Sequence, residues 1–229
     1  MKLLIFDIDG TLTDTIGVDN ECFIRAFEDE FQVELTQTDW ATFQNVTDAG
    51  LFQDLFELNF NKKPSTFEQD TFQTRFFEYL QSNLEKSPER FSEIRGAKKF
   101  IESCLQHNEI KVAFATGGWG TSAKMKLRAS GIPYKNLPLS CSNRFISRQE
   151  ILADAVEQSS REHDSASFSD VIYFGDGVWD LQTTTELDIR FVGVDAKQNG
   201  ILKNLGANQV INDFSEVESI FELLENRNR

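Results

Sequence analysis

Two short segments combine acidic residues and glycine in patterns that suit metal or phosphate chemistry. The first is Asp7-Ile8-Asp9-Gly10-Thr11, which follows an apolar run at the N-terminus. Two carboxylates two residues apart repel each other in a partly dry loop, and a divalent cation is the simplest partner that keeps both ionised. Hard carboxylate oxygens favour Mg²⁺. A turn with two solvated acids is the alternative interpretation. The second segment is Gly175-Asp176-Gly177-Val178-Trp179-Asp180, where a second acid follows the first after four residues.

Two further places in the chain offer groups that bind anions. Thr116-Gly117-Gly118 places a hydroxyl before glycines whose N–H groups can approach an anion closely, just ahead of a predicted helix. This pattern alone is a weak signal. Arg148 opens another predicted helix, where its guanidinium could reach an oxyanion.

Short apolar runs and helical patterns alternate through most of the chain. The runs are 3–6, 112–115, 171–174 and 191–194, and the helical patterns cover 97–106, 121–130, 149–158 and 181–186. Such alternation predicts an α/β protein, a Rossmann-like parallel sheet core flanked by helices, with ligands at the carboxyl ends of the strands. The three segments that follow apolar runs should therefore meet at one edge of the sheet.

The stretch from Asp19 to Glu93 lacks a convincing buried strand, and its apolar residues are spaced as in helices. Helix starts are expected at Asp19 or Asn20, at Thr38 or Asp39, at Thr47 or Asp48, and at Ser65 with Glu68 as a capping box. This pattern predicts an inserted all-helical cap domain. The predicted domains are a catalytic core of residues 1–17 and 94–229 and a cap of residues 18–93.

Taken in order, these motifs resemble those of the haloacid dehalogenase superfamily, in the branch of phosphoglycolate phosphatase and β-phosphoglucomutase. The resemblance covers essentially the whole chain and implies specific roles. The implied catalytic residues are Asp7 as nucleophile, Asp9 as general acid and base, Thr116 and Arg148. The implied phosphate-binding residues are Thr116, Gly117 and Arg148, and the implied Mg²⁺ ligands are Asp7, Asp9 through its backbone carbonyl, and Asp176. Asp180 would orient the metal shell or Arg148.

One position departs from the family pattern. The third motif is usually a lysine, and the best-placed residue here is Arg148, 32 residues after Thr116. Arginine keeps the charge but is not an equivalent replacement, because it adds a planar fork of donors. Lys124 and Lys126, on the helix that follows Thr116, remain alternatives for this role.

The resemblance predicts a Mg²⁺-dependent phosphatase that hydrolyses a small phosphomonoester through an aspartyl-phosphate intermediate. A phosphomutase of the β-phosphoglucomutase type would keep the same motifs, and the sequence leaves this alternative open. A catalytically idle protein that binds a phosphate ligand on the same scaffold is the alternative from another class. Asp9 disfavours a dehalogenase or a phosphonate-cleaving relative, because neither needs an acid at that position.

The amino-acid composition indicates which classes of molecule the protein could bind. The formal charge of −14 argues against nucleic acid and anionic lipid, and no stretch reaches the roughly 18 apolar residues of a membrane helix. Three widely spaced cysteines indicate a reducing compartment, so we expect a cytoplasmic protein acting on a small phosphorylated metabolite, with a monomer plausible. The stretch 19–93 contains 16 acids and 6 bases, which favours a small, otherwise neutral phosphomonoester.

Overall fold

The apolar runs form one parallel sheet in the computed structural model, which describes residues 1–162 and 168–225. Its order is β3-β2-β1-β4-β5-β6. The strands are β1 (Lys2–Phe6), β2 (Ile110–Ala115), β3 (Leu139–Ser140), β4 (Asp170–Gly175), β5 (Arg190–Val194) and β6 (Val210–Ile211). The four predicted strands are confirmed, whereas β3 and β6, of two residues each, were not predicted.

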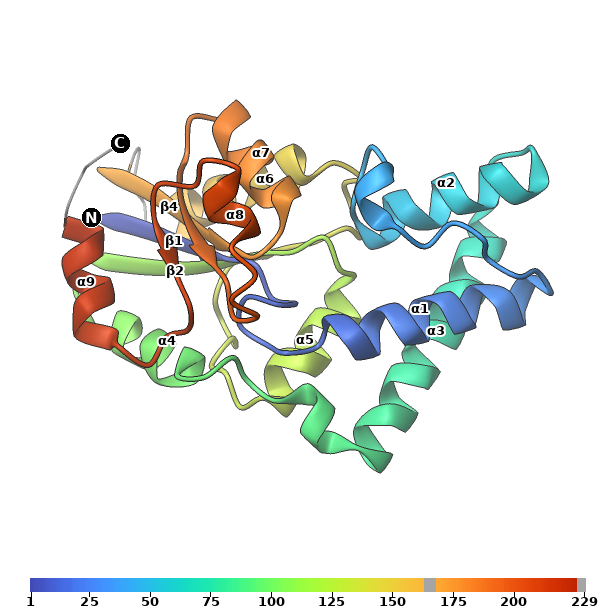
Figure 1. The fold of residues 1–229 in the computed structure, drawn as a ribbon, viewed down its shortest axis with the longest axis horizontal. Coiled ribbons are helices and arrows are strands. Elements are labelled where there is room, and N and C mark those ends of the chain that lie inside the picture. Colours follow the sequence, from blue (N-terminus) through green and yellow to red (C-terminus); the bar gives the residue numbers. More distant parts are fainter. Residues whose placement is uncertain (163–167, 226–229) are drawn as a thin grey trace.

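Helices pack against both faces of the sheet. Alternate residues of β1 are therefore buried on opposite sides. Leu3 and Ile5 belong to a cluster with α6, and Leu4 and Phe6 belong to a cluster with α4, α5 and α9. Figure 1 shows these two layers of helices around the sheet, with both termini at the end away from the cap. The helices of this core are α4 (Ala97–Gln106), α5 (Gly120–Ala129), α6 (Arg148–Glu162), α7 (Val178–Glu186), α8 (Ile201–Asn204) and α9 (Val217–Glu225).

β1 lies between β2 and β4, at the point where the strand order reverses. Phe6 is opposite Phe114 of β2 and Phe174 of β4, so the three strands end at nearly the same level. The crevice outside the carboxyl ends of such strands is the usual ligand site of an open α/β sheet. The segments after β1, β2 and β4 are the ones that begin with Asp7, Thr116 and Asp176.

The segment between β1 and α4 is helical, and Figure 1 shows its long helices gathered beyond the carboxyl ends of the strands. Its elements are α1 (Ile16–Phe31), η1 (Trp40–Thr42), α2 (Asp48–Phe60), α3 (Thr66–Lys86) and η2 (Pro88–Phe91). Asp39, Thr47 and Ser65 are N-caps as predicted, and Ser65 forms the capping box with Glu68. The predicted start of the first helix at residue 19 or 20 was wrong: α1 begins after Thr15.

Phenylalanines fill the centre of the helical segment. Phe23, Phe27, Phe52, Phe72 and Phe76 are buried together in one cluster, separate from the two clusters that flank the sheet. Two residues from beyond β2 join this cluster, Trp119 before α5 and Met125 within α5. The helical segment and the sheet domain therefore share packing through α5, and the domain limits given above stay a prediction. Among the described residues, none of the helices has the length and apolarity needed to cross a membrane.

Candidate active site

Asp7 directly follows β1, and its backbone N–H donates to the carbonyl oxygen of Phe174 at 2.9 Å. Its side chain is buried, with the residue 3% exposed. Gly10 makes the next turn with a φ of 81°, and a Cβ atom there would collide with the carboxylate of Asp176. Glycine at position 10 therefore allows the loops after β1 and β4 to approach each other.

Three carboxylates from these two loops form a cluster. One oxygen from each of Asp7, Asp176 and Asp180 lies within 4.8 Å of the others. Burial is the main cause that raises the pKa of all three, and it raises the pKa of Asp176 to about 7. The charge of Asp180 raises the pKa of Asp7 and Asp176 further, while Arg148 lowers it. The chain thus places three acids where their ionised forms are disfavoured without an added cation.

Arg148 is the first residue of α6 and lies beside this cluster. Its Nη1 lies 2.7 Å from Oδ1 of Asp180 and 3.8 Å from Oδ1 of Asp7, and its Nε donates to the carbonyl of Val46 at 2.9 Å. The guanidinium carbon lies 5.4 Å from the ring centroid of Trp179. Arg148 therefore brings a buried positive charge to Asp7 and also connects α6 to the helical segment between β1 and α4.

Asp180 is held by several donors at the start of α7. Its Oδ2 accepts from the N–H of Gly177 at 2.9 Å, and its Oδ1 accepts from the hydroxyl of Tyr173 at 3.2 Å as well as from Arg148. With these contacts and 1% exposure, Asp180 fixes the position of Arg148. Both carboxylate oxygens of Asp180 already accept hydrogen bonds from the protein. This fits a role in which Asp180 supports the arrangement around the Asp7 and Asp176 carboxylates.

Thr116 and Gly117 follow β2 at the same edge. The Thr116 N–H donates to the carbonyl of Ser140 at 3.1 Å, and its side-chain oxygen accepts from the N–H of Gly118 at 3.1 Å. A Cβ atom on Gly117 would lie 2.7 Å from Nη2 of Arg148, so a glycine at this position leaves room for the guanidinium. The structure therefore brings Thr116 and Gly117 beside Arg148, which in turn lies 3.8 Å from Asp7.

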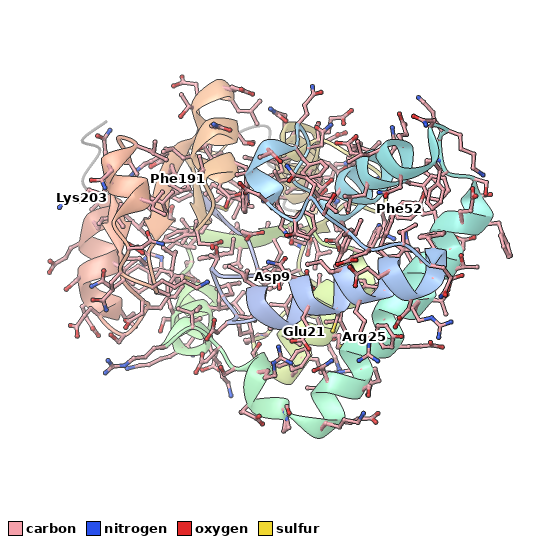
Figure 2. All side chains as sticks on the ribbon, turned by 45° about the vertical axis from the view of Figure 1, so that its right-hand side comes forward. Asp9, Glu21, Arg25, Phe52, Phe191 and Lys203 are labelled. Atoms are coloured by element: carbon pink, nitrogen blue, oxygen red, sulfur yellow. The ribbon has the colours of Figure 1, made fainter. Side chains whose placement is uncertain are left out.

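The two lysines considered as alternatives to Arg148 lie elsewhere. Lys124 is exposed on α5. Lys126 is fully buried, and its Nζ lies 2.7 Å from Oδ1 and 2.8 Å from Oδ2 of Asp9 while also contacting Asp19. Figure 2 shows Asp9 between the sheet and the helices of the cap segment. Among these three cations, Arg148 is thus the one beside Asp7, and its role in the third motif stays a prediction.

A cavity of about 280 Å³ opens beside Asp176, and Trp179 lines it. Its other lining residues include Gly10, Asp14, Ile16 and Lys197. Trp119, by contrast, is 0% exposed within the phenylalanine cluster. Of the two tryptophans that follow the motifs, Trp179 is therefore the one at the cavity.

Sequence reasoning missed three contacts around the site. They are the ion pair of Lys126 with Asp9, the hydroxyl of Tyr173 at Asp180, and the bond from the Trp119 N–H to Oδ2 of Asp48 at 2.8 Å. One signal for the first was available: Lys126 lies three residues after Ala123 and beside Leu127, on the buried face of α5. A lysine in an apolar helical register is unusual unless it has a buried partner.

The parallel sheet, the acids after its central strands and the helical insertion after β1 together define an α/β protein with a Rossmann-like core and a helical cap. The sequence matches the haloacid dehalogenase-like hydrolase family over residues 4–194, and the chain belongs to this family. No curated protein gave a significant match to the sequence.

Solved structures show the same fold at low sequence identity. A hydrolase from Pseudomonas syringae superposes with a TM-score of 0.75 at 17% identity, covering 97% of this chain and 99% of the other. A β-phosphoglucomutase from Clostridium difficile gives 0.70 at 19%, covering 96% and 95%. A predicted phosphoglycolate phosphatase from Haemophilus somnus gives 0.67 at 16%, covering 96% and 98%.

Proposed function

We propose that this hydrolase is a Mg²⁺-dependent phosphatase that cleaves a small phosphomonoester through an aspartyl-phosphate on Asp7. The observation that carries the proposal is the buried carboxylate of Asp7, which lies 3.8 Å from the Arg148 guanidinium and within 4.8 Å of two further acids. A nucleophilic carboxylate can attack an anionic phosphoryl group only where cations and donors offset the repulsion between them.

The acid cluster suits Mg²⁺, because its donors are hard oxygens and their pKa values are raised by burial and mutual repulsion. Asp7 and Asp176 would hold the ion through their side chains, and Asp9 through its backbone carbonyl. When bound, Mg²⁺ would supply positive charge to the phosphoryl oxygens.

The remaining steps belong to the chain's own side chains. Thr116, Gly117 and Arg148 bind the phosphoryl oxygens, with Arg148 oriented by Asp180. Asp7 attacks the phosphorus, and Asp9 protonates the leaving oxygen. Asp9 then accepts a proton from the water that hydrolyses the aspartyl-phosphate.

The substrate is proposed to be a small phosphorylated metabolite without further negative charge. Cap loops next to the site belong to a segment with 16 acids and 6 bases, which disfavours a multiply anionic leaving group. Buried thiols at Cys22 and Cys104 support a reducing compartment, so we place the reaction in the cytoplasm.

The proposal is tested by a screen of phosphorylated metabolites with Mg²⁺ present, scored by kcat/KM. Asp7→Asn and Asp9→Asn should each abolish phosphate release while keeping the folded circular dichroism spectrum. Asp188→Asn is the matched control, because Asp188 is exposed and has a φ of 51° that asparagine also adopts readily.

Three results would contradict the proposal. Substantial phosphate release by Asp7→Asn would exclude the aspartyl-phosphate route. A preferred sugar phosphate that is converted without net release of phosphate would indicate a phosphomutase, as the similarity to the Clostridium difficile β-phosphoglucomutase allows. Folded wild-type protein that turns over no phosphate ester would favour the idle binding protein.

A further inference from the structure

Lys126 is buried in a place where packing alone gives no reason for a lysine. It lies on α5 with its side chain 0% exposed, next to the buried residues Ala123 and Leu127. Removing an ammonium group from water costs several kcal/mol unless charged partners offset the loss. The partners here are two carboxylates, those of Asp9 and Asp19.

The contact with Asp9 involves both carboxylate oxygens, at 2.7 and 2.8 Å from Nζ. Burial alone would lower the pKa of Lys126, but the negative charges of Asp19, Asp9 and Asp48 outweigh burial and raise this pKa. Because Nζ lies within 2.8 Å of both Asp9 oxygens and also contacts Asp19, the contact of Lys126 with Asp9 is an ion pair.

The other contact of the Asp9 side chain is also a donor. The hydroxyl of Thr15 donates to Oδ1 of Asp9, and this hydroxyl lies 2.6 Å from that of Thr13. An ammonium and a hydroxyl thus fix the direction of the Asp9 carboxylate. A general base must be held within reach of the proton that it accepts.

We propose that Lys126 is a positioning residue that holds Asp9 as the general base for hydrolysis of the aspartyl-phosphate. The inference rests on the proposed function. In this step the water oxygen bonds to phosphorus, the bond from phosphorus to the Asp7 oxygen breaks, and the water proton passes to Asp9. Inorganic phosphate leaves and the Asp7 carboxylate is restored. Asp19 in the first turn of α1 holds Lys126 from the other side.

The test uses Lys126→Met with p-nitrophenyl phosphate and Mg²⁺. Nitrophenolate leaves without being protonated, so formation of the aspartyl-phosphate needs little help from Asp9. Loss of a positioned base should slow only the hydrolysis step, by about 10²-fold. We expect kcat and KM to fall together by this factor, kcat/KM to stay within about threefold of the wild type, and a burst of nitrophenolate approaching one per active site.

Three companion variants separate this role from a structural one. Lys126→Arg retains a cation and should recover much of kcat. Lys126→Met combined with Asp19→Asn removes the second buried charge as well, so this variant should fold and show the same burst if Lys126→Met alone does not fold. Arg128→Met, an exposed change on the same helix with the same loss of charge, should behave as the wild type.

The outcomes distinguish the two proposals. If kcat and kcat/KM fall equally in folded Lys126 variants, or if kcat is unchanged, Lys126 does not position the base and the inference is wrong. If the wild type releases neither nitrophenolate nor phosphate, the proposed function itself fails, and this inference with it.

Discussion

At the scale of single residues, the acids at the strand ends hold charge that the fold alone does not balance. Asp7, Asp176 and Asp180 lie within 4.8 Å of one another, and Arg148 is the cation that contacts this cluster among the described residues. Three carboxylates and one guanidinium leave an excess of negative charge. Burial and this repulsion raise the pKa of Asp176 from 3.8 to about 7, so the folded protein loses stability as the pH rises through this range, and the loss is complete above about pH 7.

Mg²⁺ should therefore stabilise the folded protein through Asp176. At a concentration about 100 times its dissociation constant, a bound ion adds about 2.7 kcal/mol, which for a chain of this size raises Tm by about 5 °C or more. We expect this rise in the wild type at pH 8, measured by differential scanning calorimetry with and without Mg²⁺.

Asp176→Asn should lose this response to Mg²⁺. Without metal, the variant should be at least as stable as the wild type, because the substitution removes a carboxylate whose ionisation opposes folding. Asp188→Asn is the control and should keep the full response. An Asp176→Asn protein whose Tm still rises by the same amount with Mg²⁺ would show that the ion binds elsewhere.

The residues of the candidate site differ in how far the sequence could place them. Asp7, Thr116 and Asp176 follow apolar runs, so parallel pairing of those runs is enough to predict that they meet. The ion pair of Lys126 and Asp9 joins residues 117 positions apart. It depends on the rotation of α5 against the sheet, which no local pattern in the sequence specifies.

At the scale of elements, the sequence predicts the long strands, whereas the short strands depend on their neighbours in the sheet. The predicted strands are apolar enough to be recognised alone, whereas β3 and β6 exist because β2 and β5 offer them backbone partners. The start of α1 was predicted too late: its N-cap is Thr15, whose side chain makes no bond to the helix and donates to Asp9. In the sequence, Ile16, Gly17 and Val18 have low helix propensity, whereas Asp19 and Asn20 are typical N-cap residues, so the sequence favours the later start.

Two N-caps of the helical segment are similar locally but differ in what else they bind. The Thr47 side chain accepts from the N–H of Gly50 at 3.1 Å and donates to the carbonyl of Ile146 at 2.7 Å, two residues before Arg148. The Ser65 side chain accepts from the N–H of Glu68 at 3.3 Å, far from the site. Only Thr47 therefore connects a cap helix to the loop that carries Arg148.

Thr47→Val and Ser65→Ala should consequently have different effects on activity. Each removes an N-cap and should cost about 1 kcal/mol of stability, measured by urea unfolding. Thr47→Val should also lower kcat/KM by about tenfold, because it would displace Arg148, to which the proposed function assigns binding of the phosphoryl group. Ser65→Ala should leave kcat/KM unchanged. Equal kinetics in the two variants would show that the Thr47 contact does not matter for Arg148.

At the scale of the whole molecule, the helical segment and the sheet domain are joined through Trp119. Its ring is 0% exposed and packs against Phe23, Phe72 and Phe76 at centroid distances of 6.3, 5.8 and 5.8 Å. The backbone N–H of Trp119 donates to Oδ2 of Asp48 in α2, and Thr116 lies three residues before Trp119 in the same loop. The phenylalanine cluster of the helical segment therefore also packs against the loop that follows β2.

Trp119→Ala should uncouple the helical segment from the sheet domain. Truncation of a fully buried tryptophan costs about 3–5 kcal/mol, and here the lost contacts lie mainly with the phenylalanine cluster. We expect hydrogen exchange measured by mass spectrometry to show faster exchange in α1, α2 and α3 but nearly unchanged protection in β1 and β4. Phe67→Ala, at a site 74% exposed, should alter neither. Equal loss of protection in the helices and in the strands would mean that the two parts unfold as one unit, and that Trp119 stabilises the whole molecule rather than the contact between its parts.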